Sequence, residues 1–211
     1  MTVIEFALIK LRSPVDELEL YEDFMQLLEV QDEWIRRYKP HLLKANKNSN
    51  LSSLYTTKTD PPYLLITAPW DSPESHQKWI ESDENKAGFA DLRRYIAPGD
   101  DSMLLFHMKP AGQHKITPPS FMRHPCFDVD RIFLEPSDKD TVQAKYQKVA
   151  DALQELKLED QIWGGWRIEK PEDTEELVVF SSHSKSPLEK AVQKIGLSHR
   201  TESYCFHHIE G

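Results

Sequence analysis

The stretch VIEFALIKL at residues 3–11 decides the fold, because residues 127–135, FDVDRIFLE, repeat its character in the second half of the chain. Both stretches are rich in β-branched and aromatic residues and predict strands. Each is followed by a helix start, Ser13-Pro14-Val15-Asp16 in the first half and Ser137-Asp138-Lys139-Asp140 in the second. In both, a serine N-cap precedes an acid three positions later, and Pro14 takes the first helical position. The chain therefore reads as one unit present twice.

Outward from residues 3–11, the first half alternates strands and helices. The helix after Ser13 is expected to bury a stripe at helical spacing: Leu18, Tyr21, Met25, Leu28 and Ile35. Strands are predicted at residues 54–57, 63–68 and 103–108. A second helical region begins at Ser72-Pro73, breaks near Gly88 and ends at Ile96. The predicted order is β-α-β-β-α-β.

The second half gives the same order. Its helical stripe is Val142, Tyr146, Val149, Leu153 and Leu156. Strands are predicted at residues 162–169, 177–181 and 204–209, with a second helix opening at Ser186-Pro187. Two dipeptides recur at matching places, Ser72-Pro73 with Ser186-Pro187 and Phe106-His107 with Phe206-His207. These echoes support an internal duplication.

This order predicts an α+β fold of two tandem ferredoxin-like βαββαβ units. The first unit is placed at residues 1–109 and the second at 127–211, joined by a linker at 110–126. Prolines make that linker extended: Pro110, Pro118, Pro119 and Pro125. The strands are apolar on both faces, so the two sheets are expected to pack together as an intrachain pseudo-dimeric α/β barrel.

Composition narrows the classes of function. The 211 residues include 35 acidic and 26 basic side chains, a formal charge of −9, which disfavours binding to nucleic acid or to an anionic membrane. We find no signal peptide or membrane span, and Cys126 and Cys205 suggest reduced thiols rather than a disulfide. A cytoplasmic protein is expected, with a small apolar or aromatic molecule as its partner and a homodimer as a possible assembly.

Residues 62–79, PYLLITAPWDSPESHQKW, carry a family resemblance. A strand ending in Trp70, followed by Ser72-x-Glu74-x-His76, resembles the antibiotic-biosynthesis-monooxygenase-like group of dimeric α/β-barrel proteins. The resemblance covers residues 1–108 and is only architectural over 127–211, where His183 replaces Trp70. A tandem single-chain form is similar to fungal members of this group.

The resemblance implies a fold and a range of activities rather than one reaction. The superfamily includes cofactor-free oxygenases of polyketide anthrones, haem-using and haem-degrading enzymes, isomerases, cyclases, and stress-response proteins. Its ligand cavity lies between the sheet and the helices of one unit. The corresponding place in this chain is therefore the expected site.

His107, His207 and Asp130 are the candidate catalytic residues. In the split βαβ topology the fourth strand pairs with the first, so His107 is expected near Glu5, and His207 near Asp128 and Asp130. A carboxylate beside an imidazole raises its basicity and makes a general base. The alternative is a cross-strand polar pair at the end of the sheet.

The candidate substrate-binding residues are mainly aromatic and cationic: Trp70, Trp163, Trp166, Arg131, Arg167 and His208. The glycines of Trp163-Gly164-Gly165-Trp166 predict a bulge that aims both indoles to one side, or else two core tryptophans. Arg131, inside an apolar strand, predicts either an internal ion pair or a ligand contact.

No cofactor is expected. The sequence has no GxGxxG or P-loop string for a nucleotide, no HxH or HxxxH pair for a metal, and no motif that singles out a haem ligand. His76, in the first turn of the second helix, is interpreted as a capping or solvated residue, and Cys205 as a core residue.

The sequence favours a cofactor-independent enzyme of natural-product metabolism, in which a histidine assists proton transfer on an apolar polycyclic or polyketide-like substrate. A monooxygenase-like reaction is the first hypothesis, and a cyclase or isomerase on the same scaffold is an alternative. A barrel that binds ligand or responds to stress without turnover is the other. A helix–sheet cavity of at least about 300 Å³ carrying one of the candidate histidines would favour the enzyme.

Overall fold

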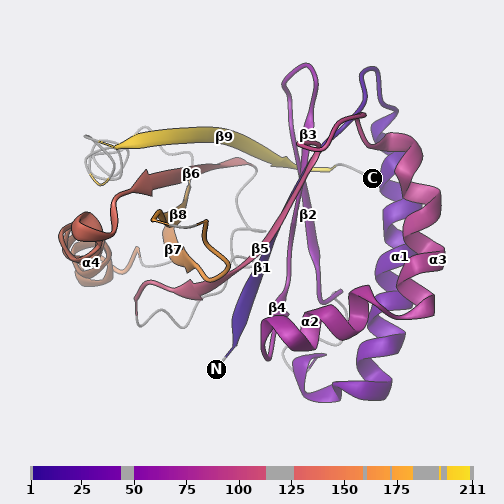
Figure 1. Cartoon of the computed structure of the whole chain (residues 1–211), viewed down its shortest axis with the longest axis horizontal. Coiled ribbons are helices and arrows are strands. Elements are labelled where there is room, and N and C mark those ends of the chain that lie inside the picture. Colours follow the sequence, from indigo (N-terminus) through magenta and orange to yellow (C-terminus); the bar gives the residue numbers. More distant parts are fainter. Residues whose placement is uncertain are drawn as a thin grey trace. The chain divides into compact units, whose positions relative to one another are not determined.

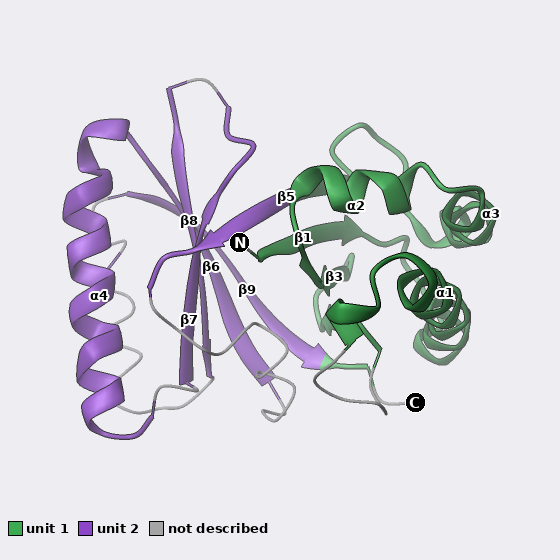
Figure 2. Ribbon diagram, turned by 90° about the horizontal axis from the view of Figure 1, so that it is seen from below, with its two compact units in different colours: residues 1–105, 208–211 green, residues 106–207 purple. Residues whose placement is uncertain are grey.

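The computed structural model describes residues 2–43, 50–112, 126–158, 161–171, 173–182, 195 and 199–209. Three predicted features lie wholly or mostly outside these residues: His183, the helix opening at Ser186, and most of the predicted linker. The chain divides into two compact units (Figure 2), unit 1 with Met1–Leu105 and His208–Gly211, and unit 2 with Phe106–His207.

Unit 1 contains an antiparallel sheet around its first strand. That strand, β1 (Val3–Lys10), pairs with β3 (Tyr63–Thr67) and with β4 (Pro69–Trp70). Strand β2 (Ser53–Thr57) pairs with the other edge of β3. Together β3 and β4 form the predicted third strand, which Trp70 ends. The unit boundary lies inside β5 (Met103–Pro110), whose first residues belong to unit 1.

The helices of unit 1 cover one face of this sheet. They are α1 (Glu17–Tyr38), α2 (Pro73–Ile80) and α3 (Asp83–Leu92), with short 3₁₀ turns at Pro40–Leu43 (η1) and Arg93–Tyr95 (η2). In Figure 1, α1 and α3 lie side by side along the sheet, and α2 lies at the end where β4 is found.

The predicted start of the first helix is wrong. Asp16, not Ser13, is the N-cap, because its carboxylate accepts hydrogen bonds from the N–H groups of Leu18 and Glu19, at 3.0 and 3.1 Å. A carboxylate that accepts two N–H groups satisfies more of the free donors than a distant serine could. Of the predicted stripe, Leu28 and Ile35 are buried and Leu18 is 54% exposed, while Leu20 and Phe24 are buried in addition.

The second helical region follows the predicted start but breaks earlier than expected. Ser72 caps α2 by accepting the N–H of Ser75 at 3.2 Å, with Pro73 in the first turn. The break falls at Ser82, which caps α3 through the N–H of Asn85. Gly88 lies inside α3, where a Cβ atom would come within 2.6 Å of a side-chain carbon of Leu27 on α1. Gly88 therefore permits close helix packing rather than a break.

Unit 2 has the strand order of a ferredoxin-like sheet. β6 (Cys126–Leu134) pairs with β9 (Arg200–His208) and β8 (Glu175–Ser182), and β8 pairs with β7 (Ile162–Arg167), all antiparallel. The end of β5 extends the sheet beyond β7.

One helix of unit 2 is described, α4 (Lys139–Glu155), which lies along one face of the sheet (Figure 2). It follows a 3₁₀ turn at Pro136–Asp138 (η4), and its N-cap Asp138 makes no side-chain capping bond, so the predicted Ser137 cap is wrong. The turn already supplies backbone partners, since the Lys139 cap N–H bonds to Pro136. Val142, Tyr146 and Leu153 of α4 are buried, as predicted.

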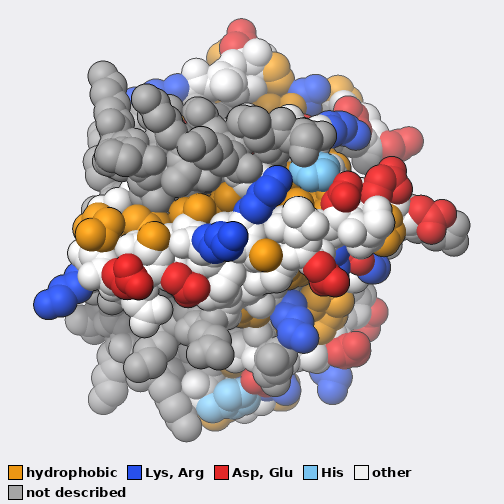
Figure 3. Space-filling view, turned by 90° about the vertical axis from the view of Figure 1, so that its left-hand side faces the viewer, with side chains coloured by type: hydrophobic (Ala, Val, Ile, Leu, Met, Phe, Trp, Pro, Cys, Tyr) orange, Lys and Arg blue, Asp and Glu red, His pale blue; other side chains and the backbone are white. Residues whose placement is uncertain are grey.

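None of the helices in the described parts of the chain combines the length and the apolar character needed to cross a bilayer. On the face shown in Figure 3, acidic and basic side chains are intermixed rather than gathered by sign.

Candidate active site

Unit 1 contains a cavity of about 160 Å³ between its sheet and its helices. Apolar side chains from β1, α1 and α3 form most of the wall, among them Ile9, Phe24, Leu28 and Phe89. Met103 and Leu105, at the start of β5, also line it and are 43% and 41% exposed, so the mouth of the cavity lies beside them. This is where the family resemblance places a ligand.

Alternate side chains of β1 form one wall of the cavity. Glu5, Ala7 and Ile9 occupy alternate positions and all line the cavity, as the twofold period of a strand requires. Ala7, between two longer side chains, contributes only a methyl group. A leucine or isoleucine at that position would fill much of the space, because protein interiors otherwise pack to nearly crystalline density.

Glu5 brings a carboxyl group into this apolar wall. It is buried, and burial raises its pKa to about 7, against the smaller opposing effect of a hydrogen bond from Trp70. The indole Nε1–H of Trp70 donates to Glu5 Oε2 at 2.9 Å. No lysine or arginine of the described residues forms an ion pair with Glu5. A carboxyl group that is part protonated at neutral pH can both take up and return a proton.

His76 completes the arrangement. Its Nε2 lies 3.5 Å from Glu5 Oε2, the same oxygen that Trp70 approaches. The imidazole stacks on the Trp70 ring, with centroids 4.4 Å apart and planes inclined by 15°. The cap at Ser72 fixes the first turn of α2 and thereby places His76 over the strand. Both Glu5 and His76 line the cavity, whereas the candidate histidines His107, His207 and His208 do not. The cavity volume is also below the roughly 300 Å³ expected for an enzyme pocket, so the predicted criterion for an enzyme is not met as stated.

A second polar pair lies on the wall. Ser52 donates its hydroxyl to Gln31 Oε1 at 2.6 Å, and both residues are buried and line the cavity. This bond uses the amide oxygen of Gln31, so its amide N–H groups are the donors that the side chain offers. The cavity thus combines an apolar wall with a carboxyl group and an amide, which is the usual make-up of a small-molecule site.

No protein-family model and no curated protein sequence matches this chain. Solved structures do match. One, from Fusobacterium nucleatum subsp. nucleatum and provisionally named a monooxygenase, matches 99% of this chain and 93% of its own, with 6% identity and a TM-score of 0.57.

A second, from Lactobacillus acidophilus NCFM and also provisionally named a monooxygenase, matches 99% of this chain and 94% of its own, with 9% identity and a TM-score of 0.55. A third, provisionally named a chlorite dismutase, matches 98% and 95%, with 11% identity and a TM-score of 0.51. The likeness shows the fold. The predicted α+β class, that of the dimeric α/β-barrel proteins, is confirmed, whereas the reaction is not decided by fold.

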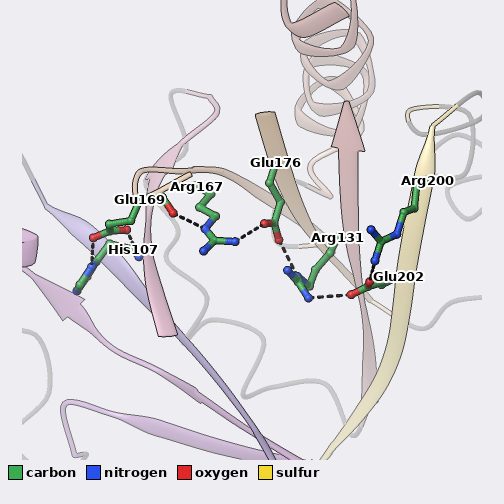
Figure 4. Close-up of polar contacts among 7 residues, drawn as sticks. All are labelled: His107, Arg131, Arg167, Glu169, Glu176, Arg200 and Glu202. Atoms are coloured by element: carbon green, nitrogen blue, oxygen red, sulfur yellow. Dashed lines mark hydrogen bonds and ion pairs between the residues drawn. The ribbon is translucent and has the colours of Figure 1, made fainter. Parts of the chain in front are cut away.

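The structure gives His107 a partner that the sequence did not suggest. Glu169 accepts two hydrogen bonds from it, one from the backbone N–H at 2.8 Å and one at Nδ1 at 2.6 Å (Figure 4). Both residues belong to unit 2. The catalytic role of His107 stays a prediction.

His207 and Asp130 do not form the expected pair. In the β6–β9 register His207 lies opposite Cys126, with its Nε2 3.8 Å from the sulfur of Cys205. Asp130 lies farther along, opposite Ser203, whose hydroxyl donates to it at 2.5 Å. Burial raises the pKa of Asp130, partly offset by that bond. Register separates them, and register could not be read from the sequence.

His208, predicted to bind substrate, belongs to unit 1 and makes a ring contact with Tyr55, with centroids 5.1 Å apart. It does not line the cavity of unit 1.

The predicted aromatic wall of Trp163 and Trp166 is absent. The pairing of β7 with β8 runs without a bulge, so the two indoles point to opposite faces. Trp166 faces α4 and donates to Gln143 at 2.6 Å, whereas Trp163 packs edge-on against Phe180. The glycine between them on the helix side, Gly164, gives room to the ring of Tyr146 instead of to a ligand.

Arg131 and Arg167 join a chain of alternating charges in unit 2 (Figure 4). Glu176 accepts from Arg131 Nε at 2.6 Å and from Arg167 Nη1 at 2.9 Å. Arg131 also reaches Glu202 at 2.8 Å, and Arg200 bonds to that same carboxylate. Of the two alternatives for Arg131, the geometry shows the ion pair.

Trp70, predicted to bind substrate, is fully buried and does not line the cavity, but it contacts Glu5 and His76, which do. His76 was interpreted as a capping residue, and Glu5 was considered only as a partner for His107. The Ser72-x-Glu74-x-His76 pattern was a usable signal, because it places the histidine one turn after the strand that Trp70 ends.

Metal and haem can be tested against the residues present. The described residues contain no group of three or more histidine, cysteine or acidic side chains placed to hold a metal ion. Haem, which the resemblance leaves open, does not fit the unit 1 cavity, whose volume suits a benzene-sized ligand rather than a porphyrin.

Proposed function

We propose that this chain is a cofactor-independent, monooxygenase-like enzyme that acts on a small apolar aromatic or polyketide-like molecule in the unit 1 cavity. The observation that carries the proposal is the buried carboxyl group of Glu5, on the cavity wall and with His76 Nε2 at 3.5 Å. The fold shared with proteins provisionally named monooxygenases supports the choice of reaction class.

Proton transfer is the step that these residues serve. Glu5, with a pKa of about 7, takes a proton from the substrate, and His76 stabilises the charge on the carboxylate oxygen that it approaches. Trp70 is a positioning residue, because its N–H holds that same oxygen and its ring supports the imidazole. This replaces His107 and His207 as the base of the expected mechanism.

Dioxygen is the oxidant in the proposed reaction. When a CH₂ group next to an electron-rich ring, or the ring CH₂ of a phenol in its keto form, loses a proton to Glu5, the carbanion reduces dioxygen. A C–O bond forms to one oxygen atom, which remains as a carbonyl, and the other oxygen atom leaves as water with both hydrogens of the CH₂ group. The apolar cavity favours this step by keeping bulk water from the carbanion.

The test is dioxygen uptake by the purified chain, measured with an oxygen electrode over a panel of phenols and anthrones. Glu5→Gln is expected to lower the rate by about 10²–10⁴-fold, the usual worth of a general base. Glu19→Gln, the same change at an exposed position of unit 1, is the control and should leave the rate unchanged.

His76→Ala and His107→Ala separate the two possible sites. A loss with His76→Ala alone supports the proposal, and a loss with His107→Ala alone overturns it in favour of a site in unit 2. Conversion of substrate without dioxygen uptake would instead indicate a cyclase or isomerase using the same base.

A further inference from the structure

The size of the unit 1 cavity limits what can enter it. Its volume of about 160 Å³ is well below the roughly 300 Å³ at which drug-sized pockets begin. It is close to that of engineered apolar cavities of about 150 Å³, which hold one benzene molecule. Three fused rings, as in an anthrone, exceed this space. The polycyclic substrate expected from the sequence therefore does not match the cavity.

The polarity of the wall sets a second condition. Near Glu5, an anionic ligand would add a like charge to a buried carboxyl group that has no lysine or arginine partner among the described residues. A neutral hydroxyl avoids this cost and donates a hydrogen bond to the carboxylate. Elsewhere on the wall, Phe24, Leu28, Ile66 and Phe89 offer apolar contacts, and the Ser52–Gln31 pair is the other polar place.

Ala7 lies at the place in the cavity that determines both the size of the ligand and its distance from Glu5. It lies on β1 between Glu5, which makes the polar end, and Ile9, which belongs to the apolar core around Phe24 and Leu28. A ring seated over Ala7 has its hydroxyl directed along the strand toward Glu5. A larger side chain at position 7 would occupy the space of that ring.

We propose that the unit 1 cavity binds a neutral compound with a single hydroxylated ring, a simple phenol or an enol of similar size, and that Ala7 sets this size limit. The inference rests on the proposed function, because both use the same cavity. It goes beyond that function by naming the class of substrate and the residue that selects it.

The experiment measures binding rather than turnover. Isothermal titration calorimetry of the full chain would use 4-methylphenol, 1-naphthol and anthrone as a series of increasing size. We expect 4-methylphenol to bind, 1-naphthol to bind about tenfold more weakly, and anthrone not to bind. Toluene and 4-methylbenzoate test the hydroxyl, and both are expected to bind at least about tenfold more weakly than 4-methylphenol.

Two substitutions at position 7 test the size limit. Ala7→Leu is expected to weaken the binding of 4-methylphenol by at least about tenfold. Ala7→Gly is expected to reduce the difference in affinity between 4-methylphenol and 1-naphthol. Ala90→Leu makes the same change at an exposed position on α3 and should bind as the unsubstituted chain does. Circular dichroism and thermal melting check that each variant folds.

The outcomes distinguish this inference from the proposed function. If anthrone binds as tightly as 4-methylphenol, or if none of the probes binds, the inference is overturned. Anthrone turnover that depends on Glu5 would keep the function while removing the size limit. If the expected size order is found and Glu5→Gln leaves dioxygen uptake intact, the site is real and the proposed chemistry is wrong.

Discussion

Glu5 in unit 1 and Glu175 in unit 2 are equally buried, at 5% and 4% exposure, yet their carboxyl groups have opposite properties. Burial raises the pKa of Glu5 to about 7, with only Trp70 opposing it. Burial also acts on Glu175, but hydrogen bonds from Lys170 and Lys139 outweigh it and hold the pKa of Glu175 below its ordinary value. Burial without a cationic partner therefore raises the pKa of Glu5, whereas two lysine partners lower the pKa of Glu175.

The two units also differ in how completely side chains fill the space between helix and sheet. In unit 2 the space between α4 and the sheet is filled, since the ring of Tyr146 lies against Gly164 and the indole of Trp166 bonds to Gln143. In unit 1 the small side chain of Ala7 leaves a cavity at the sheet. Among the described residues, the space between helix and sheet is therefore filled beside Tyr146 in unit 2 and open beside Ala7 in unit 1.

The largest expected effect comes from breaking the charge chain of unit 2. Glu176→Gln leaves Arg131 buried without its closest carboxylate, at 2.6 Å, and should lower the free energy of unfolding by about 3–5 kcal/mol. Urea unfolding at pH 7 measures it. Glu19→Gln removes a carboxylate from an exposed ion pair with Arg94 and should cost less than about 1 kcal/mol. Equal costs for the two variants would contradict the distinction between buried and exposed pairs.

A smaller effect is expected from the titration of Glu5. Its pKa rises from 4.5 to about 7 on folding, so the folded state binds more protons between these values. The stability from this group is present in full below pH 4.5 and is lost as pH rises through 7, a change of about 3 kcal/mol at most. Glu5→Gln should remove this loss and be the more stable form at pH 8.5, as measured by urea unfolding at several pH values.

Glu175→Gln is the matched variant for that comparison. Because the pKa of Glu175 is lowered, its contribution is present above the ordinary pKa of a glutamate and is lost as pH falls through the lowered value. The substitution should therefore reduce stability at neutral pH. It should not remove the loss of stability that Glu5 causes as pH rises through 7. If both variants respond to pH in the same direction, the contrast between the two carboxyl groups is wrong.

The smallest effect compares a glycine in each unit. At Gly164 a Cβ atom would lie 2.5 Å from the aromatic ring of Tyr146, so Gly164→Ala should cost about 1–3 kcal/mol. At Gly88 the nearest atom, at 2.6 Å, is the end of the Leu27 side chain, which borders the cavity and has space to move. The gain in helix propensity of about 1 kcal/mol offsets that shift. By thermal melting, the free energy of unfolding of Gly88→Ala should lie within about 1 kcal/mol of that of the unsubstituted chain. A loss as large as that of Gly164→Ala would show that unit 1 is packed as tightly as unit 2.

The strands were predictable because their signals are local. Runs such as residues 3–11 combine β-branched and aromatic residues, and their positions were obtained to within a few residues. The start of α1 was missed because Asp16 competes with Ser13 as a cap, and the choice depends on which backbone N–H groups turn toward it. The helix at Gly88 was misjudged because its reason is a contact with Leu27, a distant residue in the sequence.

The site was harder to predict, because its bonds join distant residues. Glu5 and Trp70 are 65 positions apart, and their hydrogen bond depends on the pairing of β1 with β4. The resemblance made Trp70 a candidate substrate-binding residue, but the sequence could not give the register that brings Glu5 to the same face. It also could not show that Ala7 leaves a gap, since a small residue in a strand has many possible neighbours.

The bond between the Trp70 indole and Glu5 has one more consequence. The absorbance and fluorescence of an indole respond to a nearby charge. Trp70 is therefore an intrinsic probe beside the carboxyl group of Glu5. We expect protonation of Glu5 to give a pH-dependent indole signal that Glu5→Gln removes, which separates Trp70 from the other four tryptophans.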